Sequence, residues 1–564
     1  MARVLPGRRH HRHRARVQSA GRRDPRHARP AALARVPPHD DRRPAGVTAT
    51  GVGRALTVAA DRSPDAEALI DGAERLTYRA LEARSNRVAA ALGRLGLRAG
   101  GHAIFFLKNH AAHVTVYWAC QKLGAIATPL NWRYSEGEAR YCIEDADGVV
   151  VVFEAASRAS ALGARPLVRG VRAWICVGDD APPGCVPFAE LCAGDTDPGP
   201  PRTTTDEAAT SIMLYTSGTT GRPKGVPRAH RAELSASLAH VVQSGVRFGD
   251  RTLGVMPLYH TMGVRSMIAM ALLNGALVCL PDWSAAAAAR LIQDERVTSL
   301  YLVPTLYHDL VSFPDLARYD LGSATTLGYA GAPMASALAE GVARVFRPRV
   351  FLNHLGSTEV YTFTVCDRVL EKPTCAGKPG LFGRARIVRA DPERRGSPDD
   401  VVPRGETGEL IVALDSPEAF AGYWRRPDAD ARAIRGGWYF TGDLAYEDDD
   451  GDVFTVGRID DMIISGGENI YPVEVEEVLL RHPQVVDACV VGLPDARWGQ
   501  LVAAFVVLRP GATLTADVLD QFCRDAKDFA GFKRPRRYDF VSALPKSPTG
   551  KLLRRRLLEP DRRE

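Results

Sequence analysis

Short apolar runs alternate with helical stretches through the first half of the chain. Residues 104–107 and 149–153 have the composition of buried strands, and residues 114–123 between them have that of a helix. An earlier helical face carries Leu81, Val88, Leu92 and Leu95. Because alternating strands and helices form sheets covered by helices, the pattern predicts an α/β fold with mixed or parallel sheets, folded from about Val52.

A second pattern begins after Gly457. A helix is expected to start near Pro472, followed by strands at 488–491 and 501–508 and a helix near 515–526. About 105 residues suffice for a small α+β domain. The predicted segments are an extension at 1–47, a large N-terminal domain of mixed sheets flanked by helices at 48–459, and a small C-terminal domain at 460–564.

Length and composition agree with this division. A chain of 564 residues is too long for one core and suggests two or three domains. The longest apolar stretch, residues 267–280, contains Asn274 and Gly275 and is too short to span a bilayer. The ten cysteines are scattered and form no C-x-x-C pair, which indicates a reducing compartment. We therefore expect a cytoplasmic protein, monomeric or homodimeric, with no integral membrane association.

The positive charge of the chain is concentrated at its beginning. The net charge is +7, but residues 1–43 contain 13 Arg and 3 acidic residues, so the remainder carries 7 − 10 = −3. The extension is rich in Arg, His and Pro and should be disordered. A polybasic arm and a transit peptide are alternatives, and we favour a non-functional extension. The mildly acidic body predicts no nucleic-acid partner.

An acidic run at 447–452 (EDDDGD) could suggest a cation site. Within it, Asp450-Gly451 lies between two extended segments, which is the usual context of a tight hairpin turn. We therefore interpret the run as a turn.

The strongest chemical signal lies at residues 214–226 (LYTSGTTGRPKGV). Its glycines, which include Gly218 and Gly221, let the backbone turn and expose its N–H groups. Lys224 adds a positive charge, and hydroxyl donors come from Thr216, Ser217, Thr219 and Thr220. Together these groups can surround a polyphosphate, although the G-x-x-x-x-G-K-[ST] pattern of a Walker A loop is absent. The alternative, a Gly/Thr-rich surface loop, does not explain so many specified positions.

This segment resembles the phosphate loop of the acyl-adenylate-forming (AMP-binding) superfamily. The resemblance extends over residues 50–560 and is carried, in the family's order, by MPLYH at 256–260, GSTE at 356–359, YFTGD at 439–443, GRIDD at 457–461, SGGENIYP at 465–472 and PKSPTGK at 545–551. It is greatest for the acyl/aryl-CoA ligase branch, in particular benzoate-type CoA ligases. The resemblance implies that a carboxylic acid and ATP give an acyl-adenylate, whose acyl group then passes to coenzyme A.

The resemblance implies roles for individual residues around ATP. Glu359 and Thr216 are similar to ligands of a Mg²⁺ cofactor, a hard cation that prefers oxygen. Asp443 is similar to the residue that holds the ribose, and Arg458 to a second nucleotide contact. Gly356, Ser357 and Thr358 would line the nucleotide. Taken alone, Glu359 could instead belong to a helix-capping Ser-Thr-Glu, Asp443 to a turn and Arg458 to the surface.

Lys551 resembles the family's catalytic lysine, which meets the negative charge that develops at the α-phosphate. Because Arg554-Arg555-Arg556 follows, Lys551 could instead be one more solvated base. The chain has 9 Lys against 64 Arg, yet Lys224, Lys546 and Lys551 all occupy motif positions, and the two side chains are not interchangeable. Asp460 resembles the hinge of a mobile C-terminal domain that rotates between the half-reactions, with a plain linker as the alternative.

A coenzyme A site is implied near the C-terminus. Phe532, 19 residues before Lys551, would pack on adenine, and Arg534 and Arg536 would meet phosphates. By the same resemblance, Gly467 and Trp498 would line the pantetheine tunnel, and Arg133 would reach a phosphate from the large domain. A basic surface strand with an exposed Phe is the alternative. No carrier-protein motif with a reactive Ser follows Lys551.

The acid pocket is implied by analogy. It would be lined by His260, which is also a candidate catalytic residue, and by Thr261, Met262, Gly331, Asn353, His354 and Tyr361. His354 and Tyr361 are more polar than a fatty-acid tunnel needs, so we predict a small to medium, aromatic or cyclic acid. The alternatives are a medium- or long-chain fatty-acid CoA ligase, a stand-alone adenylation enzyme and a non-catalytic binder.

Two neighbours of the pocket qualify this picture. Arg265 could pair with a second carboxylate of the substrate if it pointed inward, but we expect it to point outward. Leu355 occupies the position before GSTE where the family usually has an aromatic residue that stacks on adenine.

Overall fold

The computed structural model describes residues 51–194, 196–201, 205–216, 222–391, 396–466, 468–526, 529–546 and 552–558. The predicted extension at 1–47 lies outside these residues. Helix α1 (Gly53–Arg62) is the first described element and begins directly after Val52, the residue near which folded sequence was expected.

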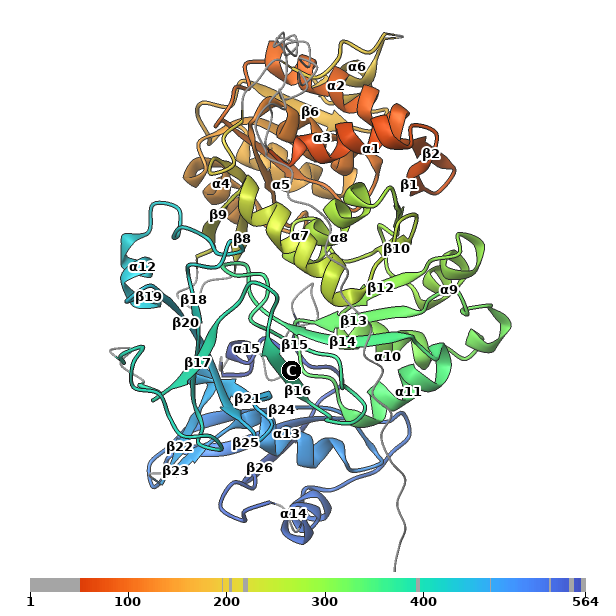
Figure 1. The fold of residues 1–564 in the computed structure, drawn as a ribbon. Helices are drawn as coiled ribbons and strands as arrows, with labels where there is room; N and C mark the ends of the chain where they lie inside the picture. The colour runs from red at the N-terminus through yellow and green to blue at the C-terminus, as the bar shows by residue number, and fades with distance from the viewer. Residues whose placement is uncertain are drawn as a thin grey trace, which may run out of the picture. The chain divides into compact units, whose positions relative to one another are not determined.

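One sheet of the described chain has seven strands in the order β7-β6-β5-β3-β4-β8-β9 (Figure 1). All neighbours are parallel except β8 and β9, which form an antiparallel pair. The strands are β3 (His102–Phe106), β4 (Ile126–Pro129), β5 (Gly148–Glu154), β6 (Ala173–Val177), β7 (Val186–Pro187), β8 (Thr210–Thr216) and β9 (Lys224–Ala229). The predicted strands at 104–107 and 149–153 are β3 and β5, and the predicted helix between them is α3 (Ala111–Leu123).

A second sheet has 14 strands in the described chain. Its order is β17-β18-β20-β21-β16-β15-β14-β13-β12-β10-β11-β1-β2, and β19 pairs with β20. The strands are β1 (Glu67–Asp71), β2 (Glu74–Thr77), β10 (Arg251–Gly254), β11 (Ala276–Cys279), β12 (Ser299–Leu302), β13 (Thr326–Ala330), β14 (Val350–Leu355), β15 (Thr364–Cys366), β16 (Cys375–Pro379), β17 (Ala385–Val388), β18 (Gly408–Ala413), β19 (Ile434–Arg435), β20 (Trp438–Glu447) and β21 (Val453–Arg458). Across the sheet, β1, β11, β10, β12, β13 and β14 are parallel neighbours, whereas β15 to β21 pair antiparallel. The mixed sheet predicted from the sequence is therefore confirmed.

Helices cover both sheets. The remaining helices of the large region are α2 (Tyr78–Arg94), α4 (Glu136–Asp145), α5 (Arg158–Ala164), α6 (Phe188–Cys192), α7 (His230–Ser244), α8 (Thr261–Leu272), α9 (Ala285–Asp294), α10 (Pro304–Val311), α11 (Ser336–Phe346) and α12 (Pro427–Ala433). The largest apolar core joins α2, α3 and α8 to both sheets, with Leu69 and Leu277 from one and Val150 and Ile175 from the other. A second core packs α9–α11 on the outer face of the larger sheet, and a third packs α4 and α5 on the smaller. The layers therefore alternate helix, sheet, helix, sheet, helix.

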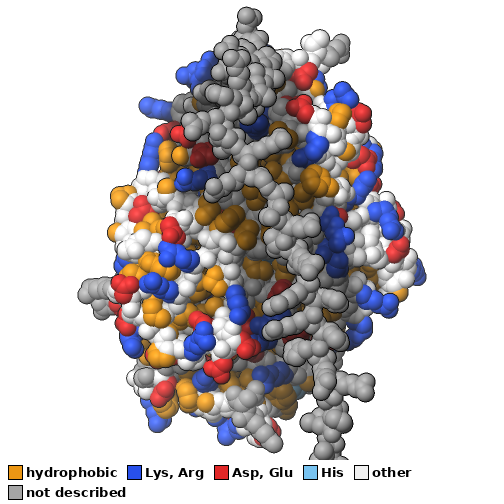
Figure 2. All heavy atoms as spheres, in the orientation of Figure 1, with side chains coloured by type: hydrophobic (Ala, Val, Ile, Leu, Met, Phe, Trp, Pro, Cys, Tyr) orange, Lys and Arg blue, Asp and Glu red, His pale blue; other side chains and the backbone are white. Residues whose placement is uncertain are grey.

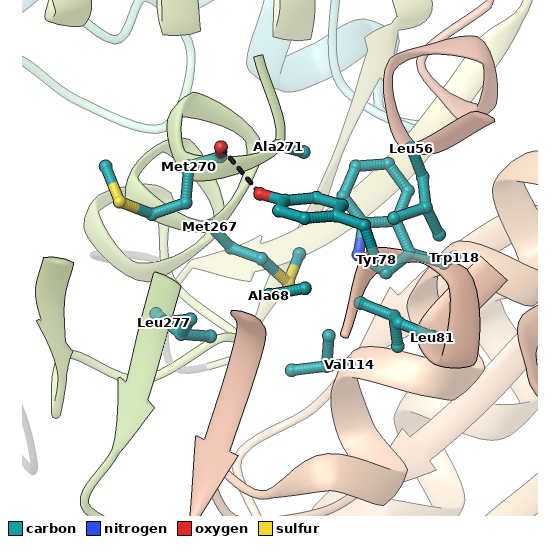
Figure 3. Close-up of a pocket in the computed structure, with 10 residues that line it drawn as sticks. All are labelled: Leu56, Ala68, Tyr78, Leu81, Val114, Trp118, Met267, Met270, Ala271 and Leu277. Atoms are coloured by element: carbon teal, nitrogen blue, oxygen red, sulfur yellow. Dashed lines mark hydrogen bonds between the residues drawn. The ribbon is translucent and has the colours of Figure 1, made fainter. Parts of the chain in front are cut away.

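The central core is closely packed around Tyr78. Its hydroxyl donates to the carbonyl oxygen of Met270 at 2.8 Å (Figure 3) and to that of Gly275 at 2.7 Å. The apolar gap beside it has a volume of about 10 Å³, which is the space of one water molecule and far too little for a substrate. The residues of Figure 3 therefore hold the two sheets together and do not form a binding site.

The longest apolar stretch of the sequence is divided between two elements. It ends helix α8, turns at Asn274, where φ is +46°, and enters strand β11. Among the described residues no helix is long and apolar enough to cross a bilayer.

The C-terminal region is a separate α+β unit with its own core, as predicted. Five described strands form its sheet in the order β23-β22-β25-β24, with β26 beside β25. Its elements are β22 (Ile463–Ser465), β23 (Glu468–Ile470), α13 (Pro472–Leu480), β24 (Val485–Asp495), β25 (Gly499–Leu508), α14 (Ala516–Asp525), β26 (Arg537–Phe540) and α15 (Arg555–Leu558). Ala488 and Val490 of β24 face the helices, whereas Cys489 and Val491 face the other side, so both faces of the sheet are covered.

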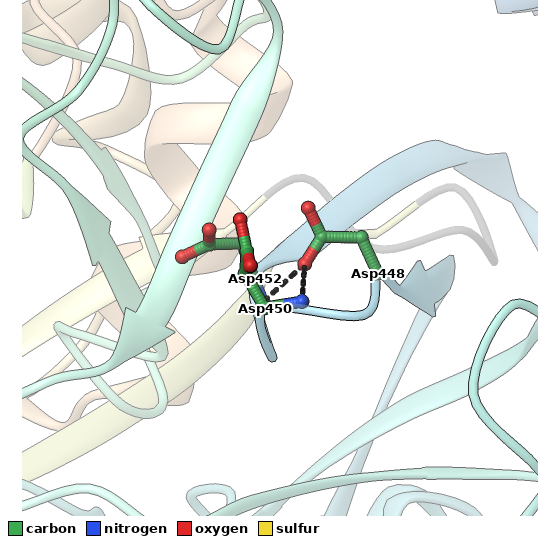
Figure 4. Close-up of side chains that lie close together, drawn as sticks. All are labelled: Asp448, Asp450 and Asp452. Carbon is green, nitrogen blue, oxygen red and sulfur yellow. Dashed lines mark hydrogen bonds between the residues drawn. The ribbon is translucent and has the colours of Figure 1, made fainter. Parts of the chain in front are cut away.

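The acidic run at 447–452 is a hairpin turn between β20 and β21, as predicted. Asp448 Oδ1 accepts from the backbone N–H groups of Asp450 and Asp452 (Figure 4). Lys372 Nζ lies 2.5–2.7 Å from a carboxylate oxygen of each of the three aspartates. An ammonium group of the chain itself therefore contacts all three acids of the only such cluster among the described residues and offsets part of its negative charge.

Charges on the described surface are mixed in sign. On the face drawn in Figure 2, basic and acidic side chains are interspersed over the described residues, with apolar side chains between them. No continuous basic face is visible there, in agreement with the acidic balance of residues 44–564.

Candidate active site

Strands β8 and β9 bring the ends of the phosphate-loop segment together. Thr216 and Lys224 are paired residues of this antiparallel hairpin, so both lie at the mouth of the loop between them. The predicted nucleotide-binding residues Ser217, Gly218, Thr219, Thr220 and Gly221 lie outside the described residues.

Lys224, Tyr423 and Glu359 lie close together. The ammonium of Lys224 is 4.1 Å from the centre of the Tyr423 ring, and the Tyr423 hydroxyl donates to Glu359 Oε1 at 2.6 Å. Burial and the neighbouring carboxylate raise the pKa of Tyr423, so its hydroxyl keeps its proton and remains a donor. One carboxylate oxygen of Glu359 is thus held in place beside the predicted phosphate site, and such a fixed, largely buried carboxylate suits a hard cation.

The segment from Gly356 to Glu359 is a turn between strands and not a helix cap. The backbone N–H of Ser357 donates to Val360 O at 2.9 Å, and Ser357 Oγ accepts from Glu359 N at 3.1 Å. The next described element is strand β15, so the helix-capping interpretation of this motif is wrong. A Cβ atom at Gly356 would lie 2.1 Å from Tyr361 O, which is why only glycine fits there.

A buried ion pair that the sequence did not reveal holds this turn. Arg228 and Glu233 are both fully buried, with Arg228 Nε 2.5 Å from Glu233 Oε1. Arg228 Nη1 donates to the carbonyl oxygens of Thr358 at 3.0 Å and Glu359 at 3.2 Å. The pair therefore fixes the backbone on which the predicted magnesium ligand stands. Arg228 lies 12 residues beyond Thr216, outside every motif, so only the fold could identify it.

The same ion pair holds Tyr361 of the predicted acid pocket. The guanidinium of Arg228 lies 3.5 Å from the centre of the Tyr361 ring, and the Tyr361 hydroxyl donates to Glu233 Oε2 at 3.2 Å. Tyr361 can offer its ring to a ligand, but its hydroxyl already has a partner.

The predicted ribose contact and the predicted second nucleotide contact form an ion pair with each other. Asp443 on β20 and Arg458 on β21 are paired residues, and Arg458 Nη1 lies 2.7 Å from Asp443 Oδ1. Asp443 raises the pKa of Arg458. The backbone N–H of Asp443 donates to Thr441 Oγ1 at 3.0 Å, so the carboxylate is held at a defined position with one oxygen toward Arg458.

The predicted acid-pocket residues come from three neighbouring places in the fold. His260 caps the N-terminus of α8, where its Nδ1 accepts from Met262 N at 3.4 Å, and Thr261 and Met262 begin the helix. Asn353 and His354 lie on β14, and Gly331 follows Ala330 of β13, which pairs with His354. The Asn353 amide donates to Cys375 O at 2.9 Å. The fold thus gathers these residues, and the motif order alone could not show that β13 and β14 are neighbours.

The expectation that Arg265 points outward is wrong. Its side chain is buried, with 2% of the residue exposed, and Nη1 donates to Thr362 Oγ1 at 3.0 Å. Nη2 donates to the Tyr301 hydroxyl. Most residues of α8 near Arg265 are apolar, so the sequence pattern does not show which face of the helix Arg265 occupies. Its orientation is set by Tyr301, a hydrogen-bond partner on strand β12.

Leu355, which replaces the usual aromatic residue, packs against an apolar cluster that contains Phe363, Phe420 and Tyr439. Its backbone oxygen accepts from Phe363 N at 2.8 Å. The aliphatic side chain is thus partly buried against rings, and at the position predicted to face adenine it has no aromatic ring to stack.

The predicted coenzyme A contact in the large region lies beside a cleft. Arg133 is exposed, and its guanidinium lies 3.8 Å from the centre of the Trp132 ring. Both line a cleft of about 620 Å³, together with Asn109, Met256 and Tyr259. Tyr259 of this cleft directly precedes His260 of the predicted acid pocket in the sequence.

The predicted coenzyme A residues of the C-terminal region differ in how firmly they are held. Trp498 is 40% exposed and packs on Gly466, where a Cβ atom would lie 2.8 Å from the indole ring; Gly467 lies outside the described residues. Phe532 is 46% exposed. Arg534 pairs with Asp520, whereas Arg536 has its pKa lowered by burial and by Arg534. Phe532 is therefore available to a ligand, and Arg534 would have to exchange its carboxylate for a phosphate.

Lys551 lies outside the described residues, but its surroundings are ordered on both sides. Lys546 and Leu552 form a β-bridge, and Lys546 Nζ lies 2.6 Å from Asp487. Arg554 Nη2 donates to both carboxylate oxygens of Glu476 at 2.7 Å. Arg554 is thus an anchor and not a solvated base, which removes part of the argument that Lys551 is one more surface charge.

Asp460, the predicted hinge, lies in a short 3₁₀ turn (Ile459–Asp461) between β21 and β22 and is exposed. Its neighbour Asp461 has a carboxylate oxygen 3.7 Å from Arg554 Nη1. The turn therefore links the last strand of the large region to the first of the small one.

Comparisons with known proteins agree with these motifs. Residues 56–424 match the family model of the AMP-binding enzyme, and residues 474–551 match that of the AMP-binding enzyme C-terminal domain. A feruloyl-CoA synthase from Amycolatopsis sp is 35% identical over 511 residues, which cover 89% of this chain and 98% of that protein. A 4-chlorobenzoate–CoA ligase from Arthrobacter sp is 33% identical, covering 89% and 93%. The long-chain-fatty-acid–CoA ligase FadD13 from Mycobacterium tuberculosis is 31% identical, covering 90% and 98%.

Solved structures show the same architecture. The anthranilate CoA ligase AuaEII in complex with anthranoyl-AMP superimposes with a TM-score of 0.82 at 27% identity, covering 90% of this chain and 96% of that one. ATP-bound MatB from Rhodopseudomonas palustris gives a TM-score of 0.80 at 28% identity, covering 90% and 98%.

Proposed function

The chain belongs to the AMP-binding enzyme family and is an AMP-forming acid–CoA ligase, and on that premise we propose that its substrate is a compact aromatic or cyclic carboxylic acid. The observation that carries this proposal is the buried polar cluster of His354, Arg265 and Tyr301 beside the predicted acid pocket. These groups are already buried, and a long hydrocarbon chain would give no hydrogen-bond acceptor to Arg265 Nε and His354 Nδ1, which lack a partner among the described residues.

The relatives support a range of acids that includes this class. Two of them are named for ferulate and 4-chlorobenzoate, and a third for long-chain fatty acids. Identities near one third leave the pocket residues free to differ, so the polar lining of this chain is the stronger guide to its substrate.

In the first half-reaction, the acid carboxylate attacks the α-phosphorus of ATP and pyrophosphate leaves. Lys224 and the phosphate loop would hold the departing phosphates, and Asp443 would accept hydrogen bonds from the ribose hydroxyls, in part exchange for Arg458. Glu359 and Thr216 would hold Mg²⁺, whose charge would offset that of the phosphates. Lys551 would bridge the acid and the α-phosphate as negative charge develops.

In the second half-reaction, the thiol of coenzyme A attacks the acyl-adenylate and AMP leaves. Rotation about Asp460 would exchange Lys551 for the pantetheine tunnel lined by Gly467 and Trp498. Phe532 would cover the adenine of coenzyme A, and its large exposed ring needs such a partner. Arg133, Arg534 and Arg536 would meet its phosphates.

A panel of acids tests the proposal. Pyrophosphate release and thioester formation would be measured with benzoate, 4-chlorobenzoate, ferulate, octanoate and palmitate, each with and without ATP and coenzyme A. We expect the best aromatic acid to exceed palmitate by about tenfold or more in kcat/KM, because each poorly matched group costs a factor of this order. Higher turnover of palmitate would contradict the proposal and favour the fatty-acid alternative. The variant Glu359→Gln should lose pyrophosphate release with every acid and serves as a control for the assay.

A further inference from the structure

Arg265 is a buried cation on the helix that begins the predicted acid pocket. It lies four residues, and hence one helical turn, beyond Thr261 on α8. At 1.5 Å per residue this places it about 6 Å further along the helix axis. That separation is close to the length of a benzene ring with its substituents, so Arg265 is at the right depth to meet the far end of a compact acid held near His260.

No carboxylate pairs with Arg265 among the described residues. The other deeply buried guanidinium, that of Arg228, has Glu233 at 2.5 Å, whereas the partners of Arg265 are the hydroxyls of Thr362 and Tyr301 and, at 3.5 Å, Tyr361 O. Glu418 is also buried, but it is linked to Arg265 through the Thr362 hydroxyl, and burial raises its pKa. The positive charge of Arg265 is therefore less completely balanced than that of Arg228.

Two nitrogen atoms at this place have no hydrogen-bond partner among the described residues. They are Arg265 Nε and His354 Nδ1, and each belongs to a residue that is only 2% exposed. A buried polar atom without a partner is costly, so two of them on residues that both contact Tyr301 call for an explanation. A bound ligand with an oxygen acceptor would supply it.

The surroundings of these atoms are flat rings. The Tyr301 ring lies 4.9 Å from that of His240 and 5.4 Å from that of His354. Burial lowers the pKa of both histidines well below the ordinary value, and the charge of Arg265 adds to this, so both rings are neutral. Among these groups the guanidinium of Arg265 is therefore the charged one, and the neutral rings beside it offer apolar faces.

We propose that Arg265 and His354 form a subsite that recognises a hydrogen-bond-accepting oxygen on the substrate, at the end remote from the reacting carboxylate. The oxygen belongs to a second carboxylate, a carbonyl or a phenolate. This inference rests on the proposed function, since it specifies which aromatic or cyclic acids the pocket takes. A purely structural Arg265, which only ties α8 to Tyr301 and Thr362, would affect all acids equally.

A matched series of benzoates tests the subsite. The acids are 4-methylbenzoate, which has no acceptor, 4-acetylbenzoate, which has a neutral one, and benzene-1,4-dicarboxylate, which has an anionic one. The kcat/KM for pyrophosphate release should be larger for the oxygen-bearing acids, by about 10- to 100-fold, as expected for a hydrogen bond to a charged group. The two oxygen-bearing acids compared with each other show whether charge or only an acceptor is required.

Variants assign the selectivity to the residue. Arg265→Met should reduce the ratio between oxygen-bearing acids and 4-methylbenzoate to near one, whereas Arg265→Lys should keep part of the preference for the dicarboxylate. Arg62→Met is the matched control. Arg62 is the last residue of α1 and donates to Leu272 O at 2.8 Å at the other end of α8, so its loss removes an arginine that contacts the same helix and should leave the ratio unchanged. If Arg265→Met does not fold, Arg265→Met/Glu418→Gln removes both buried charges and is read in the same way.

The outcomes separate the two proposals. Equal use of 4-methylbenzoate and the oxygen-bearing acids by the unaltered enzyme would overturn the subsite while the proposed function stood. An equal loss for all acids in Arg265→Met would also overturn it, because that is the behaviour of a structural arginine. Failure of the unaltered enzyme to use any benzoate would overturn the subsite, and if palmitate also exceeded ferulate in the wider panel it would overturn both.

Discussion

Two buried arginines hold the two segments that carry the predicted catalytic residues. In the large region, Arg228 pairs with Glu233 and binds the carbonyl oxygens of Thr358 and Glu359. In the C-terminal region, Arg554 lies three residues beyond Lys551 and binds both carboxylate oxygens of Glu476. An arginine–glutamate pair therefore lies beside the predicted magnesium ligand, and a second one lies near the predicted catalytic lysine in sequence.

The two pairs differ in depth. Arg228 and Glu233 have no exposed side-chain surface, whereas the side chains of Arg554 and Glu476 are 16% and 10% exposed. Arg228 acts directly on the backbone of Glu359, but Arg554 holds only the stem that follows Lys551. The large region thus fixes the backbone of Glu359 itself, whereas the C-terminal region fixes the chain three residues beyond the predicted catalytic lysine. A magnesium ligand would benefit from the first arrangement, and a residue that enters and leaves a site, as proposed for Lys551, would benefit from the second.

The deeper pair should matter most for stability. Arg228→Met leaves the Glu233 carboxylate buried without its cationic partner, and we expect the free energy of unfolding to fall by about 3–5 kcal/mol. Chemical denaturation of the large-region core, followed by tryptophan fluorescence, would measure this. In Arg228→Met/Glu233→Gln both charges are gone, so most of the loss should be recovered; a double variant as unstable as the single one would show that the charges are not the reason.

Lys551 should matter for one half-reaction only. Because it meets charge that develops as the acid attacks phosphorus, Lys551→Ala should slow adenylation by about 10²–10³-fold, a typical cost of one lost donor at such a position. Given synthetic acyl-AMP, the variant should still form the thioester. The control is Lys378→Ala, which removes a lysine that binds Asp450 O at the hairpin turn and should leave both steps unchanged. Equal loss of both steps in Lys551→Ala would refute the two-state account.

The shallower pair should give a smaller and pH-dependent effect. Burial raises the pKa of Glu476 and the charge of Arg554 opposes this, so Arg554→Met should raise that pKa further. A carboxyl whose pKa is higher in the folded than in the unfolded state binds more protons when folded. The fold therefore loses stability as the pH rises from the unfolded pKa to the folded pKa. We expect a loss of about 1–3 kcal/mol at pH 8 that shrinks as the pH falls toward 5.

Denaturation of this variant at several pH values would measure the effect. Arg524→Met, which breaks an exposed pair with Asp520, is the control and should show little change at any of them. A loss in Arg554→Met that is the same at pH 5 and pH 8 would contradict the assignment to Glu476.

Phe532 should give the smallest effect, confined to coenzyme A. Its ring is 46% exposed, so Phe532→Ala removes little from the fold but should raise the KM for coenzyme A by about 5- to 10-fold, the cost of one aromatic contact of roughly 1 kcal/mol. Phe540→Ala, with a ring exposed to 41% on the neighbouring strand β26, is the matched control. An equal rise in the KM for ATP would contradict the assignment of Phe532 to the coenzyme A site.

The sequence by itself was enough for the fold class, the family and the identity of the motif residues. Apolar periodicity located β3, α3, β5, β24, β25 and α14, because it depends on neighbours two to four residues apart. The motif spelling was enough to single out Glu359, Asp443 and Lys224. Tight turns were also readable, as at Asp450-Gly451, because their geometry is set by the residues within them.

Only the tertiary structure decided which polar groups meet inside. Tyr423 donates to Glu359, 64 residues away in the sequence, and Arg228 donates to the carbonyl of Thr358, 130 residues away. Arg265 points inward because the fold brings Tyr301 and Thr362 beside it, although they lie 36 and 97 residues further along the chain. These contacts depend on strand order and register, which bring β12, β13 and β14 side by side. A local pattern cannot encode such neighbours, since the free energy of a buried arginine is set by what the fold places opposite it and not by the residues beside it in sequence.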